Sequence, residues 1–388
     1  MDWPLNKPAS EVLRLPGGGH APEWAQFDPD WYRARHGGSD DDAELMSEYL
    51  ALGQRQGRSP NRWFDEAWYR ARYPGVARAV EDGAYASGFD NYFRGGCLDR
   101  APHWLFDEAL YRRENADLTD DLLRAQEVFN GYDHYLRHGD REGRVGHRFL
   151  DAKAYAAQFP PDIAQAARDA GAFRHFLTAR TGGAEPRTTP YFDPTWYLRQ
   201  YPAVARAIAA GAVGSALEHY LGNATPTLFD PSPWFSENWY IASNPGLAEA
   251  IGPDRFRNGY AHFLTNGARE LRAPSPGFDL RWYADQPPVR AALERGEAPD
   301  AFTHFVAIGA ARGLPTAPPE AAIDAAAPAE ALARRRARAT AQAPRARGSI
   351  SASTAPPRCR SWRRCATSSR PLWRRWRRCA KGSRNPSN

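Results

Sequence analysis

The stretch FDPTWYLRQYPAVARAIAAGAVGSALEHYLGNA, residues 192–224, contains the signals that decide the fold. Asp193 is a favourable N-cap, because its carboxylate can accept hydrogen bonds from the free N–H groups of a first helical turn. Pro194 fits the first helical position, where its missing N–H costs nothing. Pro202 disfavours helical geometry at Tyr201, so the first helix is expected to be only about two turns long.

Two further helices are predicted in the same stretch. Residues 203–210 are rich in Ala and predict a second helix that ends near Gly211. Residues 215–221 predict a third, which Gly222 ends. The apolar residues of this third helix recur at the i, i+3, i+4 spacing of one helix face; they are Leu217, Tyr220 and Leu221.

The same pattern recurs seven times along the chain. The units begin at Phe27, Phe64, Phe106, Phe149, Phe192, Phe235 and Phe278, in steps of 37, 42, 43, 43, 43 and 43 residues. Units of this size are marginal as independent domains, and their helices are too short to be stable alone. We therefore predict an all-α fold in which seven units of about three short helices each bury their apolar faces against one another.

Aromatic residues at one position of the first helix are the clearest candidates for the repeat core, because one such side chain buries about 150–250 Å². The candidates are Trp31, Tyr32, Trp68, Tyr69, Tyr111, Tyr155, Trp196, Tyr197, Trp239, Tyr240, Trp282 and Tyr283. Such rings could instead form a row of stacking platforms for sugars or nucleobases.

Half of the ten histidines occupy a single position in the second half of the repeat: His134, His175, His219, His262 and His304. One His per unit, without Cys or carboxylate at fixed spacing, does not make a metal site. We expect each to be half-buried and bonded to a neighbouring carbonyl or carboxylate across the interface between units. Asp40, Asp41 and Asp42 form a polar link that could bind a cation, although a solvated loop is the simpler interpretation.

The net charge of +6 combines two unlike parts. Residues 1–333 hold 34 Lys and Arg against 45 Asp and Glu, a net charge of −11, whereas residues 334–388 hold 17 Lys and Arg and no acid. An acidic body argues against broad phosphate binding there. The predicted organisation is a flexible leader over 1–26, the repeat array over 27–318, an Ala/Arg-rich linker or helix over 319–338, and a disordered basic tail over 339–388.

The tail admits several interpretations. Arg interleaved with Trp suits binding to nucleic acid or to an anionic membrane. The combination of Arg, Trp, Cys, Ser and Pro without acids is also typical of GC-rich coding DNA that is translated out of frame. Three of the four cysteines lie in these last residues, so a disulfide framework is not expected.

Catalytic signatures are missing from the sequence. There is no G-x-S-x-G, no Gly-rich phosphate loop after a strand and no metal-binding His pair at i, i+4. We expect no catalytic residue, no metal and no cofactor. The N-terminus lacks the layout of a secretory signal, and no apolar run reaches the length of a membrane span, so a cytoplasmic location is expected.

The repeat resembles a tandem repeat of large bacterial proteins, where it accompanies glycosyltransferases of the family-2 type or forms part of large surface proteins. The shared pattern is F-D-x-x-W-Y-L-x-x-Y-P-D-V-A followed by H-Y-L-x-x-G-x-x-E-G-R-x-P. It is carried here by residues 192–224 together with the links GDREGR at 139–144 and GQRQGRSP at 53–60, and the resemblance covers residues 27–318. It implies a role in bacterial cell-surface glycan synthesis.

Three functions remain open from the sequence. The chain can be a non-catalytic scaffold or docking surface for a protein partner or a glycan-assembly component. It can be the N-terminal part of a family-2-type glycosyltransferase whose catalytic domain is missing from this chain. Third, the basic tail can bind nucleic acid or an anionic membrane.

Overall fold

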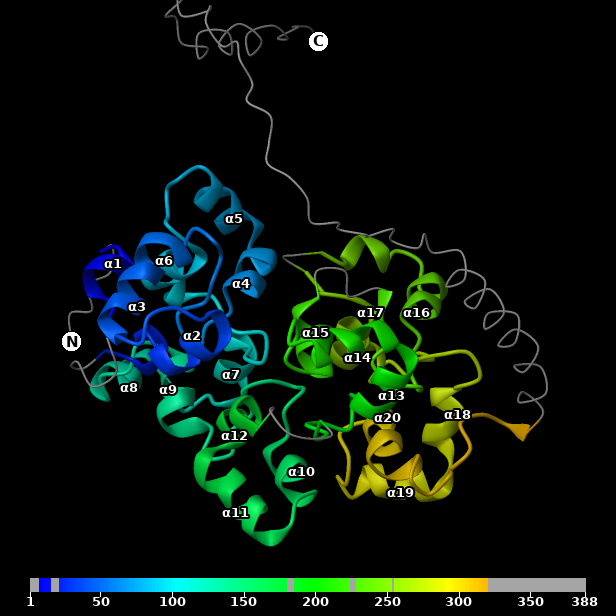
Figure 1. Ribbon diagram of the computed structural model, residues 1–388. Helices are drawn as coiled ribbons and strands as arrows, with labels where there is room; N and C mark the ends of the chain where they lie inside the picture. Colours follow the sequence, from blue (N-terminus) through cyan, green and yellow to red (C-terminus); the bar gives the residue numbers. More distant parts are fainter. Residues whose placement is uncertain (1–6, 15–20, 180–184, 224–227, 253–254, 320–388) are drawn as a thin grey trace, which may run out of the picture. The chain divides into compact units, whose positions relative to one another are not determined.

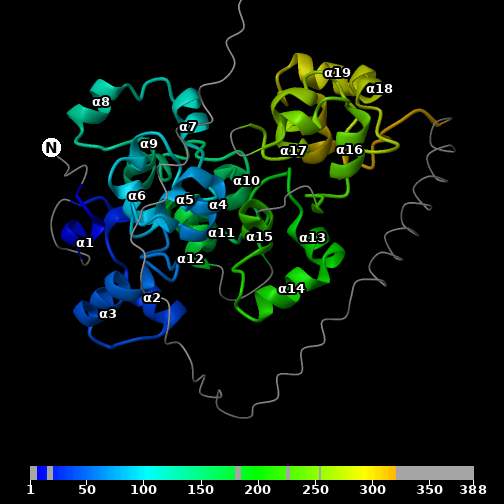
Figure 2. The ribbon, with the colours of Figure 1, turned by 90° about the horizontal axis from the view of Figure 1, so that it is seen from above.

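The computed structural model describes residues 7–14, 21–179, 185–223, 228–252 and 255–319. Within these ranges the secondary structure is helical, with two isolated β-bridges and no strand, so the predicted all-α class is confirmed (Figures 1 and 2). The predicted basic tail and almost all of the predicted 319–338 linker lie outside the described residues.

Short helices follow one another along the described chain. The α-helices are α1 (Ala9–Val12), α2 (Pro29–His36), α3 (Asp42–Glu48), α4 (Glu66–Arg72), α5 (Pro74–Glu81), α6 (Gly88–Phe93), α7 (Glu108–Glu114), α8 (Asp120–Ala125), α9 (Gly131–His134), α10 (Ala152–Ala157), α11 (Pro161–Ala170), α12 (Ala172–Ala179), α13 (Pro194–Gln200), α14 (Pro202–Ala209), α15 (Ala216–Gly222), α16 (Glu237–Ser243), α17 (Gly259–His262), α18 (Leu280–Asp285), α19 (Pro287–Glu294) and α20 (Ala301–His304). Short 3-10 turns span Glu23–Ala25, Gly96–Leu98 and Ala248–Ala250.

The local signals in residues 192–224 act as predicted. Asp193 caps α13, with its Oδ1 accepting the Trp196 N–H at 2.9 Å. Tyr201, before Pro202, has the non-helical backbone angles φ −123° and ψ 74°, so α13 ends there. Gly211 follows α14 with a φ of +72°, a conformation that favours glycine. Each short helix therefore begins and ends for a local reason.

Two units depart from the predicted three helices. The unit that begins at Phe27 has only α2 and α3, because it is the shortest and the Gly37–Gly38 pair follows α2 directly. The unit that begins at Phe235 has the 3-10 turn Ala248–Ala250 in place of a second α-helix.

In four units the last helix, which is α3 in the first unit and the third helix in the others, widens into a π-helical turn that ends at a glycine. These turns are Tyr49–Gly53, Tyr135–Gly139, Phe263–Gly267 and Phe305–Gly309. Their hydrogen bonds span five residues; for example, the Asp140 N–H donates to the Tyr135 carbonyl at 2.9 Å. A π-helical turn is rare, and its recurrence at one position indicates that the packing requires it.

A backbone hydrogen bond joins the start of each unit to its end. The N–H of the residue that precedes the first helix donates to a carbonyl in the link after the third. The pairs are Asp28–Pro60, Asp65–Pro102, Asp107–Gly146, Asp151–Thr188, Asp193–Pro231, Ser236–Pro274 and Asp279–Thr316, at 2.8–3.3 Å. Each unit is therefore a loop of chain that closes on itself.

Neighbouring units pack in a way that recurs along the chain. The Tyr132 hydroxyl donates to the Trp63 carbonyl at 2.7 Å, and the Tyr260 hydroxyl donates to the Tyr191 carbonyl at 2.8 Å. Both bonds span 69 residues. Trp63 directly precedes the second unit and Tyr191 directly precedes the fifth. Counting each with the unit that follows it, the third unit binds the second as the sixth binds the fifth.

The same two groups of units are also closed by a contact between their first and last members. Trp63 stacks on Phe173 of the fourth unit, with ring centroids 6.2 Å apart. At the corresponding place, the Tyr191 hydroxyl lies 3.0 Å from the Thr303 hydroxyl of the seventh unit. We call the units that begin at Phe64, Phe106 and Phe149 the first triplet, and those that begin at Phe192, Phe235 and Phe278 the second triplet.

The predicted flexible leader is in part a packed element. Trp24 is fully buried, and its ring lies 4.9 Å from that of Tyr92. The Ala9 N–H donates to Asp90 Oδ1 at 2.9 Å. The prediction was wrong for these residues because a single Trp buries enough area to fix a short segment; residues 1–6 and 15–20 lie outside the described chain.

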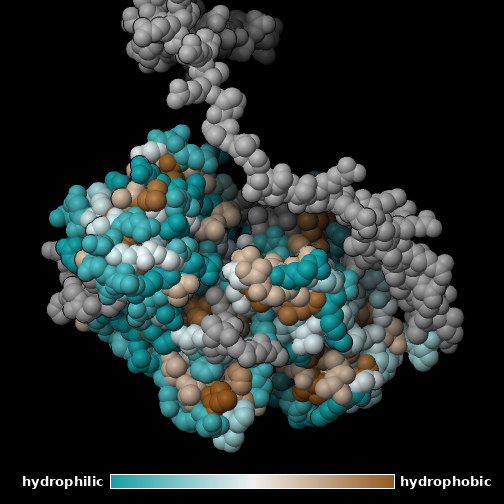
Figure 3. Space-filling model, viewed as in Figure 1, coloured by the Kyte–Doolittle hydropathy of each residue, from teal (hydrophilic) through white to brown (hydrophobic). Residues whose placement is uncertain are grey.

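The surface shown in Figure 3 is mostly hydrophilic, with small apolar patches. One patch lies over α11, where Ile163 is 41% exposed. Among the described residues, no helix has the length and apolar character needed to cross a membrane.

Candidate functional site

The aromatic candidates separate into two classes by burial. The tyrosines are at most 1% exposed; they are Tyr32, Tyr69, Tyr111, Tyr155, Tyr197, Tyr240 and Tyr283. The tryptophans only pack against the margin of the core and are partly exposed; they are Trp31, Trp68, Trp196, Trp239 and Trp282. Successive residues of a helix point about 100° apart, so the two members of a Trp-Tyr pair cannot both face inward.

The five histidines bind this buried tyrosine. Their Nδ1 atoms lie 2.8–3.0 Å from the hydroxyl of the tyrosine in the same unit; the pairs are Tyr111–His134, Tyr155–His175, Tyr197–His219, Tyr240–His262 and Tyr283–His304. The expected partner, a carbonyl or carboxylate across a unit interface, was wrong. A histidine side chain in the third helix reaches the first helix of its own unit more directly than it reaches the next unit.

The second unit shows that the buried tyrosine hydroxyl needs a polar partner but not specifically a histidine. Asn91 occupies the histidine position there, and its Oδ1 accepts the Tyr69 hydroxyl at 2.9 Å. An amide therefore replaces the imidazole, and the common requirement is a polar partner for a buried phenol. The histidines are therefore structural residues, whose hydrogen bonds to tyrosine hold the third helix against the first.

Replacing His134 with Asn is expected to keep most of the stability at pH 8 and to reduce the loss of stability in acid. Burial lowers the pKa of His134 below the ordinary 6.5. As the pH falls, the unfolded chain therefore binds a proton at this residue at a higher pH than the folded chain does. The contribution of His134 to the free energy of unfolding is fully present above pH 6.5 and is lost as the pH falls through its folded pKa. Urea unfolding at several pH values would measure this. His138→Asn, at an exposed position nearby, is the control; equal acid sensitivity of both variants would contradict the assignment.

The glycine that ends the third helix makes room for the same tyrosine. A Cβ atom at Gly53 would lie 2.5 Å from the Tyr32 hydroxyl, which is closer than real Cβ contacts. The same overlap would occur in the pairs Gly96–Tyr69, Gly139–Tyr111, Gly267–Tyr240 and Gly309–Tyr283. The phenol is thus enclosed by a polar partner and by the bare backbone of a glycine.

A buried carboxylate fixes the start of the third helix. Glu108 accepts the N–H groups of Gly131 at 2.9 Å and of Tyr132 at 3.1 Å. Glu66 and Glu237 hold the first two N–H groups of α6 and α17 in the same way. Free N–H groups and the helix dipole both favour an anion at this end.

In the fourth and fifth units the carboxylate comes from elsewhere in the chain. Asp140 accepts the Phe173 N–H at 2.8 Å, and Glu185 accepts the Leu217 N–H at 2.9 Å. The carboxylate therefore comes from different positions in different units, but it accepts N–H groups at the start of the third helix in each case. This carboxylate was not among the predicted residues, although Glu recurs one residue after the N-cap in three units and was the signal for it.

Replacing Glu108 with Gln is expected to flatten the pH dependence of stability between about pH 6.5 and 8. Burial raises the pKa of Glu108 from 4.5 to about 7. The folded chain then holds a proton that the unfolded chain has released, so this residue makes stability fall as the pH rises from 4.5 through 7, by at most about 3 kcal/mol, of which about 1 kcal/mol falls between pH 6.5 and 8. Histidines with lowered pKa values change stability in the opposite direction, chiefly below pH 6.5, and the variant leaves their contribution in place.

Urea unfolding at the two ends of that range would measure the change. Glu114→Gln is the matched control, because Glu114 is half-exposed at the end of the same helix, α7. A Glu108→Gln variant that keeps the slope of the original protein would contradict the prediction.

The acidic link of the first unit is used for capping. Asp41 caps α3, with its Oδ1 accepting the N–H groups of Ala43 and Glu44 at 2.9 Å. Asp42 pairs with Arg33 at 2.6 Å. Across the part of the chain that the structure describes, no group of three His, Cys, Asp or Glu side chains is placed to hold a metal ion.

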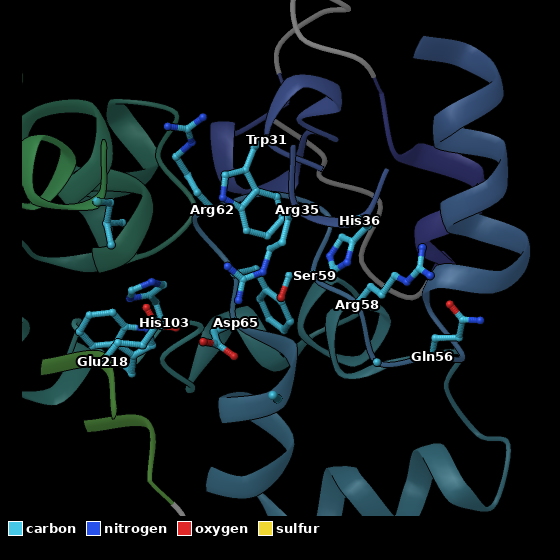
Figure 4. A pocket seen from close by; sticks show the side chains of 15 residues that line it. Trp31, Arg35, His36, Gln56, Arg58, Ser59, Arg62, Asp65, His103 and Glu218 are labelled. Carbon is cyan, nitrogen blue, oxygen red and sulfur yellow. The ribbon is translucent and has the colours of Figure 1, made fainter. Parts of the chain in front are cut away.

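A pocket of about 270 Å³ lies beside the first exposed Trp (Figure 4). Trp31, Arg35 and His36 reach it from α2, and the Arg35 guanidinium carbon lies 5.6 Å from the centre of the Trp31 ring. Figure 4 shows Asp65 on the other side of this guanidinium. Arg58 also lines the pocket and donates to the Tyr32 hydroxyl at 3.1 Å.

The titratable groups in this pocket are not arranged for nucleophilic catalysis. Burial, followed by the charges of Arg58 and Arg35, lowers the pKa of His36 to about 4, and its buried Nε2 finds no hydrogen-bond partner among the described residues. Ser59, although it lines the pocket, uses its Oγ to accept the Glu66 N–H at 3.0 Å. The pocket therefore offers an aromatic face and cations for contact, without a Ser–His pair.

The chain matches no protein-family model, and no curated protein and no solved structure is significantly similar to it.

Proposed function

We propose that the chain is a non-catalytic repeat module that serves as a scaffold or docking surface for a glycosyltransferase or its glycan substrate in bacterial cell-surface glycan synthesis. The observation that carries the proposal is that the most regularly repeated residues have structural roles. The tyrosines, histidines, glycines and glutamates that recur are bonded within their own units and hold helices together. The resemblance of the repeat supplies the biological setting.

The partly exposed tryptophans provide the contact surface. Trp196, Trp239 and Trp282 occupy the same position of the first helix in three successive units. Trp is favoured in recognition surfaces, because its large ring contributes contact area at a small cost in side-chain entropy. A row of equivalent rings suits a ligand with a repeating structure.

Two measurements on the full chain test this proposal. Release of nucleoside diphosphate from a panel of nucleotide sugars is expected to stay at background. Immobilised chain is expected to retain a family-2-type glycosyltransferase or a bacterial cell-surface polysaccharide, and to retain it less after Trp196→Ala, Trp239→Ala and Trp282→Ala are combined. Leu98→Ala with Leu228→Ala is the control, because these side chains are 63% and 65% exposed elsewhere. Turnover by the chain, or no retention of either probe, would refute the proposal.

A further inference from the structure

Two adjacent cavities lie where side chains of the first and second triplets meet. One has a volume of about 440 Å³ and the other of about 490 Å³, both within the usual range of small-molecule sites. They share the wall formed by His147 and Phe149. The Phe149 ring packs 5.9 Å from Tyr220 and 6.0 Å from Tyr260 of the second triplet. We call the two together the joined cavity.

The joined cavity contains cations that lack a carboxylate partner. Arg257 donates from Nη2 to the carbonyls of Tyr220 at 2.8 Å and Asn223 at 3.0 Å, and among the described residues no carboxylate pairs with it. Burial, with a further contribution from the charge of Arg72, lowers the pKa of Arg257 to about 10. A buried cation bonded only to neutral groups is costly, and an anion in the cavity would offset that cost.

A second arginine repeats this arrangement. Arg148 lines the larger cavity and donates from Nη1 to the Leu264 carbonyl. The neighbouring His147 accepts the Phe149 N–H at its Nδ1, at 3.1 Å, so the neutral ring carries its proton on Nε2 and can donate it. Burial lowers the pKa of His147 to about 4, which keeps the ring neutral.

The acids of the joined cavity already have other partners. Asp107 caps α7, with its Oδ1 accepting the Leu110 N–H at 2.9 Å. Glu108 holds the first N–H groups of α9, as described above. Asp99 is exposed and lies 3.7 Å from the Arg100 guanidinium. Among the described residues none of these carboxylates forms an ion pair with Arg257 or Arg148. With Glu114, the lining holds four carboxylates against six arginines, and this positive excess suits an anion.

The walls of the smaller cavity are aromatic. Trp68 lines it and packs edge-to-face on Tyr73, with ring centroids 6.3 Å apart. The negative face of an aromatic ring attracts the weakly positive C–H groups of a sugar ring. The acidic body of the chain, with a net charge of −11 over residues 1–333, disfavours a long polyanion, whereas a ligand with one or two charges needs only the local arginines.

We propose that the joined cavity binds a sugar that carries a carboxylate or a phosphate. Arg257 and Arg148 hold the anionic group, and Trp68 packs against the sugar ring. This inference rests on the proposed glycan-related function and names the ligand class of one site in it.

Calorimetric titration of the full chain with glucuronate, glucose 1-phosphate, glucose and inorganic phosphate tests this proposal. We expect saturable binding of glucuronate or glucose 1-phosphate, and the tighter of the two identifies the anionic group. Glucose is expected not to bind. Arg257→Gln is expected to weaken binding by at least about tenfold, as is typical for the loss of a charge-assisted hydrogen bond. Arg206→Gln, at an exposed position on α14, is the control and also accounts for nonspecific binding by basic residues elsewhere in the chain.

Two further variants keep the test decisive. Arg257→Lys preserves the charge and is expected to retain most of the binding, which separates loss of the ligand from loss of the fold. Trp68→Ala is expected to weaken binding of the charged sugars without changing that of inorganic phosphate. Equal binding by Arg257→Gln and the original chain would overturn the site, and a single-stranded oligonucleotide that binds there more tightly than either sugar would overturn the ligand class. Neither outcome would affect the docking test with the Trp196, Trp239 and Trp282 variant.

Discussion

Gly139→Ala is expected to lower the free energy of unfolding by about 3 kcal/mol, the upper range for overpacking a core. The added methyl group would overlap the hydroxyl and ring of Tyr111, which is fully buried. The tyrosine cannot move away, because its hydroxyl is bonded to His134 at 2.8 Å. Urea unfolding followed by circular dichroism would measure the loss.

Two companion variants make this prediction specific. Gly75→Ala on α5 has open space around the new methyl group and is expected to stabilise the chain by about 0.5–1 kcal/mol. Tyr111→Phe removes the hydroxyl, so Gly139→Ala should cost less in that background. Equal costs of Gly139→Ala with and without the hydroxyl would show that the overlap is not its cause.

Tyr197→Ala is expected to cost about 4 kcal/mol, whereas Trp196→Ala at the adjacent position is expected to cost about half as much. Tyr197 is fully buried and bonded to His219 at 2.9 Å, whereas Trp196 packs at the margin of the core. Midpoints of urea unfolding for the two variants would compare them directly. A larger loss for Trp196→Ala would contradict the division of the repeat aromatics into core and surface.

Local chemistry is the part of the fold that the sequence predicts well. Asp193 as a cap, Pro202 as a stop and Gly211 as a terminator each act within a few residues of chain. Such signals do not depend on distant packing, so the short helices could be placed from one unit. The shortened first unit, with the Gly37–Gly38 pair, differs for reasons that are also local.

The bonds within a unit depend on the exact path of the third helix and were not predictable in the same way. The π-helical turn Tyr135–Gly139 is what brings Gly139 against Tyr111. Nothing in side-chain periodicity distinguishes a five-residue hydrogen-bond span from the usual four-residue span. The partner of His134 was therefore predicted wrongly, and the residue is buried rather than half-buried, although a structural role was predicted.

The candidate cavities were less predictable still. Arg257 and His147 lie more than one hundred residues apart in the sequence, and neither belongs to the repeat pattern. They meet because the two triplets pack on each other, through contacts such as that of the Phe149 ring with Tyr220 and Tyr260. A repeat that looks uniform in sequence does not reveal that its units associate in threes.

The backbone bond that closes each unit determines how the chain would respond to mechanical force. Tension applied at the two ends would load the seven closing bonds in series, because each lies where its unit begins and ends. When one bond and its helices yield, a unit of 43 residues releases roughly 150 Å of extended chain. Because units also pack on one another in triplets, a module of this kind would lengthen in steps of a single unit or a whole triplet, which suits a tether that must stretch without coming apart.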